Sequence, residues 1–215
     1  DLRMSRGLGD VYKRQEEDYS AAIYSKEDLI INGNGTLNVN AGYRNGIKST
    51  DDCIIVSGTL NITSTEDGII GKDLCGIVAG DININAGSDG IKSTYDTDTT
   101  KGNVIIEGGN ITIKASNDGI QAENILVIND GTINIKTNNG AADTTQTHID
   151  NMDMGRGGFG FNNNKTTTTT DDTSESRKGI KAGNMLIIND GDITIDSDDD
   201  SVHCNSVIYL SLIHI

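Results

Sequence analysis

Short runs in which apolar and polar residues alternate recur along this chain at a period near 22 residues. One five-residue phrase, a Gly followed by alternating polar and apolar residues, reads GTLNV at 35, GTLNI at 58, GDINI at 80, GNITI at 109, GTINI at 131 and GDITI at 191. Such alternation is typical of β-strands with one buried face. A fixed period of this length predicts a solenoid in which each repeat forms one turn of a coil.

A second phrase follows the same period and marks where the repeats are interrupted. It pairs a Gly or Ser with a following Ile or Val, and the first residues of these pairs are at 46, 68, 90, 119, 179 and 201, giving steps of 22, 22, 29, 60 and 22. The two long steps predict insertions at Tyr95–Lys101 and at about 138–176. The second insertion contains MGRGGFGF and TTTTTDDTSES, a composition that indicates a flexible excursion from the coil.

These patterns predict an all-β fold, a right-handed parallel β-helix with rungs of about 22 residues. The chain has no Pro, no Trp and only 4% aromatic residues. That composition suits a coil filled by ladders of Ile, Val, Leu and Ala, in which a Pro would remove a hydrogen bond between rungs. The handedness follows from the rule for parallel β-crossovers.

The two ends of the chain do not follow the repeat. Residues 1–15 read DLRMSRGLGDVYKRQ and residues 206–215 read SVIYLSLIHI, without the Gly, Asn and Asp punctuation of the body. Both resemble translated sequencing-adapter read-through, so we expect them to be non-native and assign 16–205 to the β-helix domain. Any secretion signal would then be missing from this sequence. A genuine N-terminal helical cap is the alternative for residues 1–15.

The charge excludes some partners. A net charge of −15 argues against nucleic acid, because neutralising phosphates requires clustered Lys and Arg. No apolar run is long enough to span a membrane, so we expect no membrane insertion, and we expect a monomer. Cys53 and Cys75 lie 22 residues apart, and we expect them to stack in one interior column as small apolar fillers.

Stacking of the rungs predicts a metal site. Equivalent positions of neighbouring rungs lie about 4.8 Å apart. Two carboxylates at that distance repel by roughly 3 kcal/mol at an effective dielectric constant near 20, and protonation, a Lys or a bound cation must relieve this repulsion. An all-oxygen site suits Ca²⁺. We therefore predict calcium at a cluster formed by Asp51, Asp52, Asp67, Asp73 and Asp89; the alternative is that these side chains are solvated corner residues.

A second acidic run gives a further metal candidate. Asp199 and Asp200 precede the last repeat, beside Asp196, Asp198 and His203. We predict metal binding at Asp199 and Asp200. His203 alone is more typical of a polar residue facing a groove than of a transition-metal ligand, and no Cys/His spacing typical of zinc is present.

Several phrases together resemble a known family. NGIKSTDD, DGIIGKD, SDGIKST, DGIQA and KGIKA, read over about 21–205, resemble bacterial extracellular carbohydrate-binding proteins with a parallel β-helix. The resemblance implies bound Ca²⁺ and affinity for plant cell-wall polysaccharide, including cellulose and acidic pectin-type polymers. It also implies a fold similar to that of calcium-dependent pectate lyases. Ile70 departs from the pattern, because the neighbouring rungs carry Lys48 and Lys92 there.

The first functional hypothesis is an extracellular binding module. Its binding face would consist of a row of side chains on one sheet together with one aromatic residue, namely Lys48, Lys92, Gln121, Lys181 and Tyr43. Bound calcium would bridge to the carboxylates of a polygalacturonate-type polymer, and Lys would add direct ion pairs. The scarcity of aromatic platforms favours acidic over neutral glycans. The alternative role of Lys48 and Lys92 is to neutralise the stacked Asp residues.

Two other functions stay open. A calcium-dependent pectate lyase would need a basic residue to remove the C5 proton, and Lys92 or Lys72 could serve. A structural or adhesive surface repeat would show no dependence on glycan. We find no Ser/His/Asp or Cys/His arrangement with an interpretable order.

Overall fold

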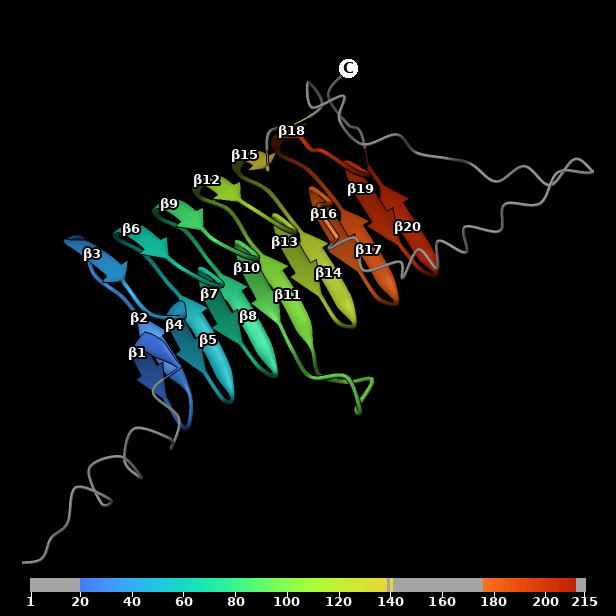
Figure 1. Cartoon of the computed structure of the whole chain (residues 1–215). Coiled ribbons are helices and arrows are strands. Elements are labelled where there is room, and N and C mark those ends of the chain that lie inside the picture. Colours follow the sequence, from blue (N-terminus) through green and yellow to red (C-terminus); the bar gives the residue numbers. More distant parts are fainter. Residues whose placement is uncertain (1–19, 139, 141–175, 212–215) are drawn as a thin grey trace, which may run out of the picture.

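Twenty β-strands and no helix make up the described part of the chain, which covers residues 20–138, 140 and 176–211 of a computed structural model. Within these residues there is accordingly no helix long and apolar enough to cross a membrane. The strands wind into a coil that runs from β1 at one end to β20 at the other (Figure 1).

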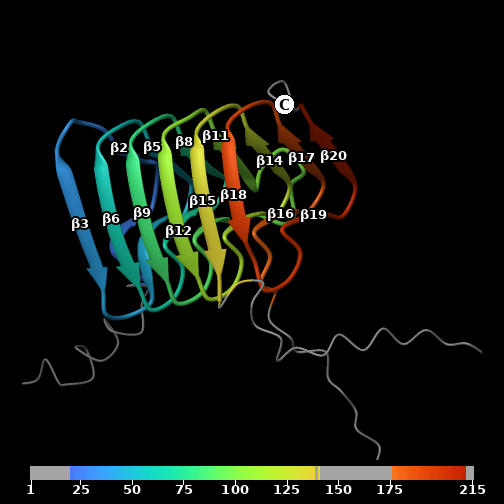
Figure 2. The same cartoon turned by 90° about the horizontal axis from the view of Figure 1, so that it is seen from above.

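Three parallel sheets run along the coil, and each turn contributes one strand to each sheet. Sheet A contains β1 (Ala21–Ser25), β4 (Asn45–Ser49), β7 (Ile69–Gly71), β10 (Ile91–Ser93), β13 (Ile120–Ala122), β16 (Ile180–Ala182) and β19 (Val202–Cys204). Sheet B contains β2 (Leu29–Ile31), β5 (Asp52–Ile55), β8 (Leu74–Ile77), β11 (Asn103–Ile106), β14 (Ile125–Ile128), β17 (Met185–Ile188) and β20 (Val207–Leu210). Sheet C contains β3 (Thr36–Ala41), β6 (Thr59–Ser64), β9 (Asp81–Ala86), β12 (Asn110–Ala115), β15 (Thr132–Thr137) and β18 (Asp192–Asp196), and Figure 2 shows it as one layer.

The predicted parallel β-helix is confirmed, and both sequence phrases fall where the period requires. The Gly-Ile phrase forms sheet A, and the five-residue phrase leads into sheet C. In-register pairing places Ile47 beside Ile69 and Ile62 beside Ile84, one rung of 22 residues apart. Alternate residues of a strand point to opposite faces, so each inward position becomes a ladder of like side chains along the coil.

Those ladders form the core. Ile47, Ile69, Ile91 and Ile120 stack inside sheet A and are fully buried, and similar ladders line the inner faces of sheets B and C. Cys53 and Cys75 pair in register on β5 and β8 with no exposed surface, which confirms their predicted stacking. Both are free thiols, and a hydrogen bond with Cys53, followed by burial, raises the pKa of Cys75 well above its usual value.

The two insertions leave the coil without shifting its register. Tyr95–Lys101 lies between β10 and β11, and both strands still pair with their neighbours in the previous rung. After the long insertion, Ile180 pairs with Ile120 and Ile193 pairs with Ile133. Residues 141–175, on which the prediction of a flexible excursion rests, lie outside the described residues.

The C-terminal boundary requires a correction. We excluded 206–215 from the fold, but Val207–Leu210 form β20, which pairs with β17 in sheet B through contacts such as Ile187 beside Tyr209. The physical reason is that parallel pairing requires only that the backbone groups of one strand align with those of its neighbour. This run keeps the strand spacing of sheet B, although it lacks the corner residues of the repeat. Residues 1–15 lie outside the described residues.

A column of glycines explains the Gly in the Gly-Ile phrase. At Gly68, an added Cβ would lie 2.5 Å from the carbonyl oxygen of Gly90 and 2.5 Å from Cγ2 of Ile84. Gly46, Gly90, Gly119 and Gly179 make equivalent close approaches to the next rung. At these five positions the corner between sheets C and A has no room for a side chain.

We expect Gly68→Ala to destabilise the fold by about 1–3 kcal/mol, because the new methyl group must displace backbone of the next rung. The matched control is Gly42→Ala, since a Cβ at Gly42 meets nothing within 4 Å. Urea unfolding of both variants measures the difference. Equal stability of the two variants would contradict this account of the repeat.

Candidate functional site

A row of side chains runs along the outer face of sheet A. In-register pairing aligns Tyr24 with Lys48, Lys48 with Ile70, and Ile70 with Lys92. The row continues through Gln121, Lys181 and His203. This is the order predicted from the sequence, and it includes Ile70, which is only 4% exposed and interrupts the basic residues. We call these residues the outer row.

A second column of side chains lies at the N-terminal ends of the same strands and accepts hydrogen bonds from backbone N–H groups. Asp67 accepts a hydrogen bond from the backbone N–H of Asp89 at 3.0 Å, and Asp89 accepts one from the N–H of Asp118 at 2.9 Å. Asn45 begins the series by accepting the N–H of Asp67, and Asp118 ends it by accepting the N–H of Lys178. We call Asn45, Asp67, Asp89 and Asp118 the acid ladder; each member ties one rung to the next.

Basic residues of the outer row form ion pairs with Asp89 and Asp118, two of the three carboxylates of the acid ladder. Lys92 Nζ lies 2.6 Å from Asp89 Oδ2, and Lys181 Nζ lies 3.1 Å from Asp118 Oδ2. Burial raises the pKa of Asp89 despite the attraction of Lys92. Burial alone would lower the pKa of Lys92, but Asp89 outweighs it and the net direction is upward. Lys92 therefore has the structural role that the sequence left open for Lys48 and Lys92, and Lys181 has the same role.

A separate group of carboxylates lies at the opposite ends of the strands of sheet A. Carboxylate oxygens of Asp28, Asp51 and Asp52 all lie within 4.8 Å of one another. Asp73, which is buried, lies beside them and forms an ion pair with Lys101. We call Asp28, Asp51, Asp52 and Asp73 the acidic cluster.

Two carboxylates of the acidic cluster have raised pKa values. A hydrogen bond with Asp73, followed by burial and repulsion from neighbouring carboxylates, raises the pKa of Asp51. Burial and repulsion from Asp28 and Asp73 raise the pKa of Asp52, and Lys101 only partly offsets them. The cluster thus keeps unrelieved negative charge at neutral pH.

The prediction of a single metal cluster is wrong in one respect. Asp51, Asp52 and Asp73 belong to the acidic cluster, whereas Asp67 and Asp89 belong to the acid ladder. In the rung of β7, Asp67 precedes the sheet A strand and Asp73 follows it, so the strand separates the two groups. The outer row lies between these two acidic borders.

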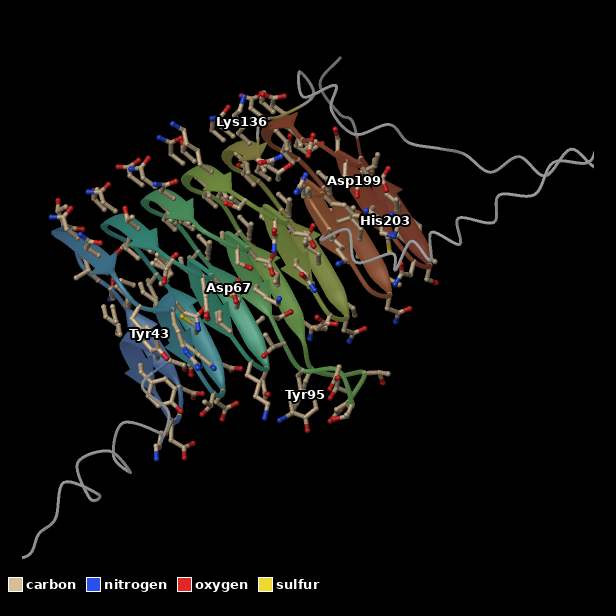
Figure 3. The ribbon with its side chains drawn as sticks, viewed as in Figure 1. Tyr43, Asp67, Tyr95, Lys136, Asp199 and His203 are labelled. Atoms are coloured by element: carbon tan, nitrogen blue, oxygen red, sulfur yellow. The ribbon has the colours of Figure 1, made fainter. Side chains whose placement is uncertain are left out.

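At the C-terminal end of the coil, Asp199 and Asp200 are already paired. Lys178 forms an ion pair with Asp199 and lies 3.6 Å from Asp200, whose Oδ2 is 3.0 Å from His203 Nδ1. Burial opposes the charge on Asp199, but the hydrogen bond from Lys178 lowers its pKa overall. Figure 3 shows Asp199 and His203 at the other end of the coil from Tyr43. A cation here would have to displace Lys178.

Asp198 lies beside this group and has a different environment. Its Oδ2 accepts hydrogen bonds from Arg177 at 2.8 Å and from Asn138 at 3.0 Å. Its Oδ1 is buried and has no hydrogen-bond partner among the described residues. Asp198 is therefore held by the coil rather than exposed to a ligand.

Two polar residues predicted for the binding face are in local contacts. Tyr43 is 67% exposed, and its hydroxyl accepts a hydrogen bond from Arg44 Nε at 3.1 Å. Gln121 Nε2 donates to Glu123 Oε1 at 2.9 Å. Among the described residues, Lys48 forms no hydrogen bond or ion pair, so it differs from Lys92 and Lys181.

Several residues of these borders were not predicted. Asp28 is one, although the sequence signal existed, because Lys26-Glu27-Asp28 parallels Thr50-Asp51-Asp52. Lys101, which belongs to the insertion, forms an ion pair with Asp73. Tyr95 lies on the same loop (Figure 3), and the Nζ atoms of Lys72 and Lys101 lie 5.0 and 5.1 Å from the centre of its ring. An insertion has no equivalent in other rungs, so the repeat gives no prediction of its contacts.

Comparison with known proteins gives consistent matches. A family model described as "Carbohydrate-binding domain-containing protein" matches residues 7–212. A protein of that description from Acetivibrio thermocellus is 42% identical over 48 residues, which are 22% of this chain and 17% of that protein. A solved structure, described as "Structure of the polysaccharide lyase-like protein from C. thermocellum, Gadolinium derivative", shows 36% identity and a TM-score of 0.56. The match covers 58% of this chain and 50% of that one, so this chain spans at most half the length of either relative.

We expect the raised pKa of Asp51 to appear as a pH-dependent stability. An acid whose pKa is raised by folding binds its proton more tightly in the folded state than in the unfolded state. The fold therefore becomes more stable as the pH falls from neutrality through the raised pKa toward the ordinary value of 3.8. Asp51→Asn removes the repulsion at all pH values. The variant should therefore unfold at a higher temperature than wild type near pH 7, and this advantage should shrink as the pH falls.

Thermal unfolding in EDTA over a pH series measures this difference. The matched control is Asp81→Asn on the outer face of sheet C, for which the difference from wild type should stay nearly constant. A constant difference for Asp51→Asn as well would show that Asp51 is an ordinary solvated carboxylate.

Proposed function

The chain belongs to the family of carbohydrate-binding domain-containing proteins, and on that premise we propose that it binds acidic polysaccharide of the polygalacturonate type along the outer row, with Ca²⁺ at the acidic cluster. Such polymers lie outside cells, so we also propose an extracellular or cell-surface location. A pectin-type ligand is favoured over cellulose because aromatic platforms for neutral sugars are scarce on this face.

The acidic cluster is the observation that carries this proposal. Three carboxylates within 4.8 Å of one another offer the all-oxygen donor set that hard cations prefer. The raised pKa values of Asp51 and Asp52 indicate a charge imbalance that a divalent cation would relieve. Asp28, Asp51 and Asp52 would hold the ion, and Asp73 would contribute once Lys101 leaves it. The ion would supply a bridge to a uronate carboxylate.

The outer row would supply direct contacts to the polymer. Lys48 lies in β4, three residues before Asp51 in the same rung, and it makes no ion pair with the described residues. It is therefore available to bind a uronate carboxylate beside the acidic cluster. Lys92 and Lys181 would act mainly by holding the acid ladder, because each is paired with its carboxylate.

A polysaccharide lyase is the second candidate, supported by the likeness to a protein described as polysaccharide lyase-like. Proton abstraction requires a base that is unprotonated near the working pH. The pKa of Lys92 is raised through its pairing with Asp89, which keeps the ammonium charged and disfavours it as that base. Incubation with polygalacturonate and calcium should yield no unsaturated product absorbing in the ultraviolet. Steady formation of that product would establish the lyase instead.

We expect calcium to raise the thermal unfolding midpoint of the chain after EDTA treatment, because the ion binds the folded state only. The double variant Asp51→Asn, Asp52→Asn should lose this rise. Asp199→Asn should retain it, because Lys178 already neutralises Asp199. A calcium response that persists in the double variant and disappears in Asp199→Asn would move the site to the last rung.

We expect calcium-dependent retention of the chain on immobilised polygalacturonate. The double variant should lose retention, Lys48→Ala should weaken it severalfold, and Asp81→Asn on sheet C should leave it unchanged. Affinity electrophoresis in gels containing polygalacturonate, with cellulose pull-down as a comparison, measures these differences. Absence of retention by every acidic polysaccharide tested with calcium would overturn the proposal.

A further inference from the structure

The strands of sheet B have a sequence pattern that the binding proposal does not use. They read DCII in β5, NVII in β11, ILVI in β14 and MLII in β17, where the strands of sheet C alternate strictly. Near-continuous apolar runs are typical of parallel strands that are buried on both faces. In this structure only the inner face of sheet B is covered by other described residues.

The outward positions of sheet B form an apolar stripe along the whole coil. In-register pairing aligns its central column as Ile30, Ile54, Gly76, Ile105, Val127, Ile187 and Tyr209. One side of this column is bordered by Leu74, Ile125, Met185 and Val207 together with the polar residues Asp28, Asp52 and Asn103, and the other side by Val56 and Val78 together with Asn32, Glu107, Asn129 and Asn189. In the column itself Ile30 is 63% exposed and Tyr209 is 58% exposed, while Ile54, Ile105, Val127 and Ile187 are half-buried.

The outer face of sheet C shows that solvated faces of this coil are polar. Its outward positions are almost entirely Asn and Thr with a few charged residues; Asn38, Asn61 and Asn83, for example, form a hydrogen-bonded series with distances of 2.8 and 3.1 Å. Both sheets are built from the same repeat, so the composition of sheet B is not a general feature of the coil. A contiguous exposed apolar surface of this kind marks an interaction site.

We propose that the apolar stripe of one copy packs against the apolar stripe of a second copy, forming a face-to-face homodimer. Two flat sheets with the same rung spacing can interdigitate their aliphatic side chains, as the inner faces of β-sandwiches do. The stripe matches itself in length and spacing, which is what an interface with twofold symmetry requires. This proposal replaces the expectation of a monomer and does not depend on glycan binding.

The distribution of charge favours a second copy over other occupants. The chain carries a net charge of −15, yet the central column of the stripe contains no charged residue. Two copies can therefore place this column at the centre of an interface, with Asp52 on one side of it and Glu107 on the other at the polar rim. The side chains of that column other than Tyr209 have no hydrogen-bonding group, so the stripe offers almost nothing to the hydroxyls of a sugar chain.

The size of the stripe indicates a weak dimer. Seven strands spaced about 4.8 Å apart span about 34 Å, and five residues at about 3.3 Å each span about 16 Å. The footprint is then about 540 Å² per copy, or about 1,100 Å² in total, at the low end of specific interfaces. We therefore expect an equilibrium between monomer and dimer that depends on protein concentration.

The test is sedimentation velocity of the full chain from about 1 µM to about 1 mM, a range that brackets weak association. The mass of wild type should rise with concentration from the monomer value of 22.8 kDa toward twice that value. Ile105→Glu should weaken association at least tenfold, because dimerisation would bury the new charge. The matched control is Thr112→Glu, which places the same charge at a half-buried outward position of the next strand, on sheet C, and should associate like wild type.

A milder variant separates loss of association from loss of folding. Ile105→Thr keeps a β-branched side chain, should retain the circular dichroism and unfolding midpoint of wild type, and should still weaken the dimer. A wild-type mass that stays at the monomer value over the whole concentration range overturns the proposal. It is also overturned if Ile105→Glu associates as strongly as wild type. A monomeric wild type whose stripe retains a polysaccharide, with retention abolished by Ile105→Glu, would likewise overturn it and assign the stripe to glycan binding.

Discussion

In-register stacking of parallel strands is the constraint on which the rest of this molecule depends. It places each side chain about 4.8 Å from its counterpart in the next rung, so like residues lie beside like residues along the whole coil. For Ile47, Ile69 and Ile91 this repetition builds a dry, close-packed core. For carboxylates the same repetition brings repulsion, which each column must relieve in its own way.

The two acidic borders of sheet A show two different outcomes of that repulsion. In the acid ladder, one oxygen of Asp89 accepts a backbone N–H of the next rung and the other binds Lys92, so the charge contributes to the cohesion of the coil. In the acidic cluster, Lys101 is the one ion-pair partner that the described residues provide, and the pKa values of Asp51 and Asp52 are raised. The difference between a structural column and a candidate binding site is therefore whether the surrounding protein already satisfies the charge.

The sequence predicted the period, the outer row and the positions of both insertions, because these follow from repetition alone, but it did not predict that each rung has three strands. It did not separate Asp67 from Asp73. The period shows which residues stack along the coil, but it does not show that a strand lies between these two residues within one rung. Asp28 was left out of the predicted cluster although its segment parallels Thr50-Asp51-Asp52, and the pairing of Leu29 with Cys53 confirms that parallel. The pairing of Lys101 with Asp73 depends on an insertion, which the repeat does not describe.

The unchanged register across the long step between β15 and β16 has a consequence for how such proteins diversify. Ile180 lies beside Ile120 as closely as Ile120 lies beside Ile91, although 60 residues separate the first pair and 29 the second. The length of chain emerging at this corner is thus uncoupled from the geometry of the scaffold. Related proteins can exchange whole segments there while the coil remains the same, and the corner is a natural grafting point for a foreign peptide.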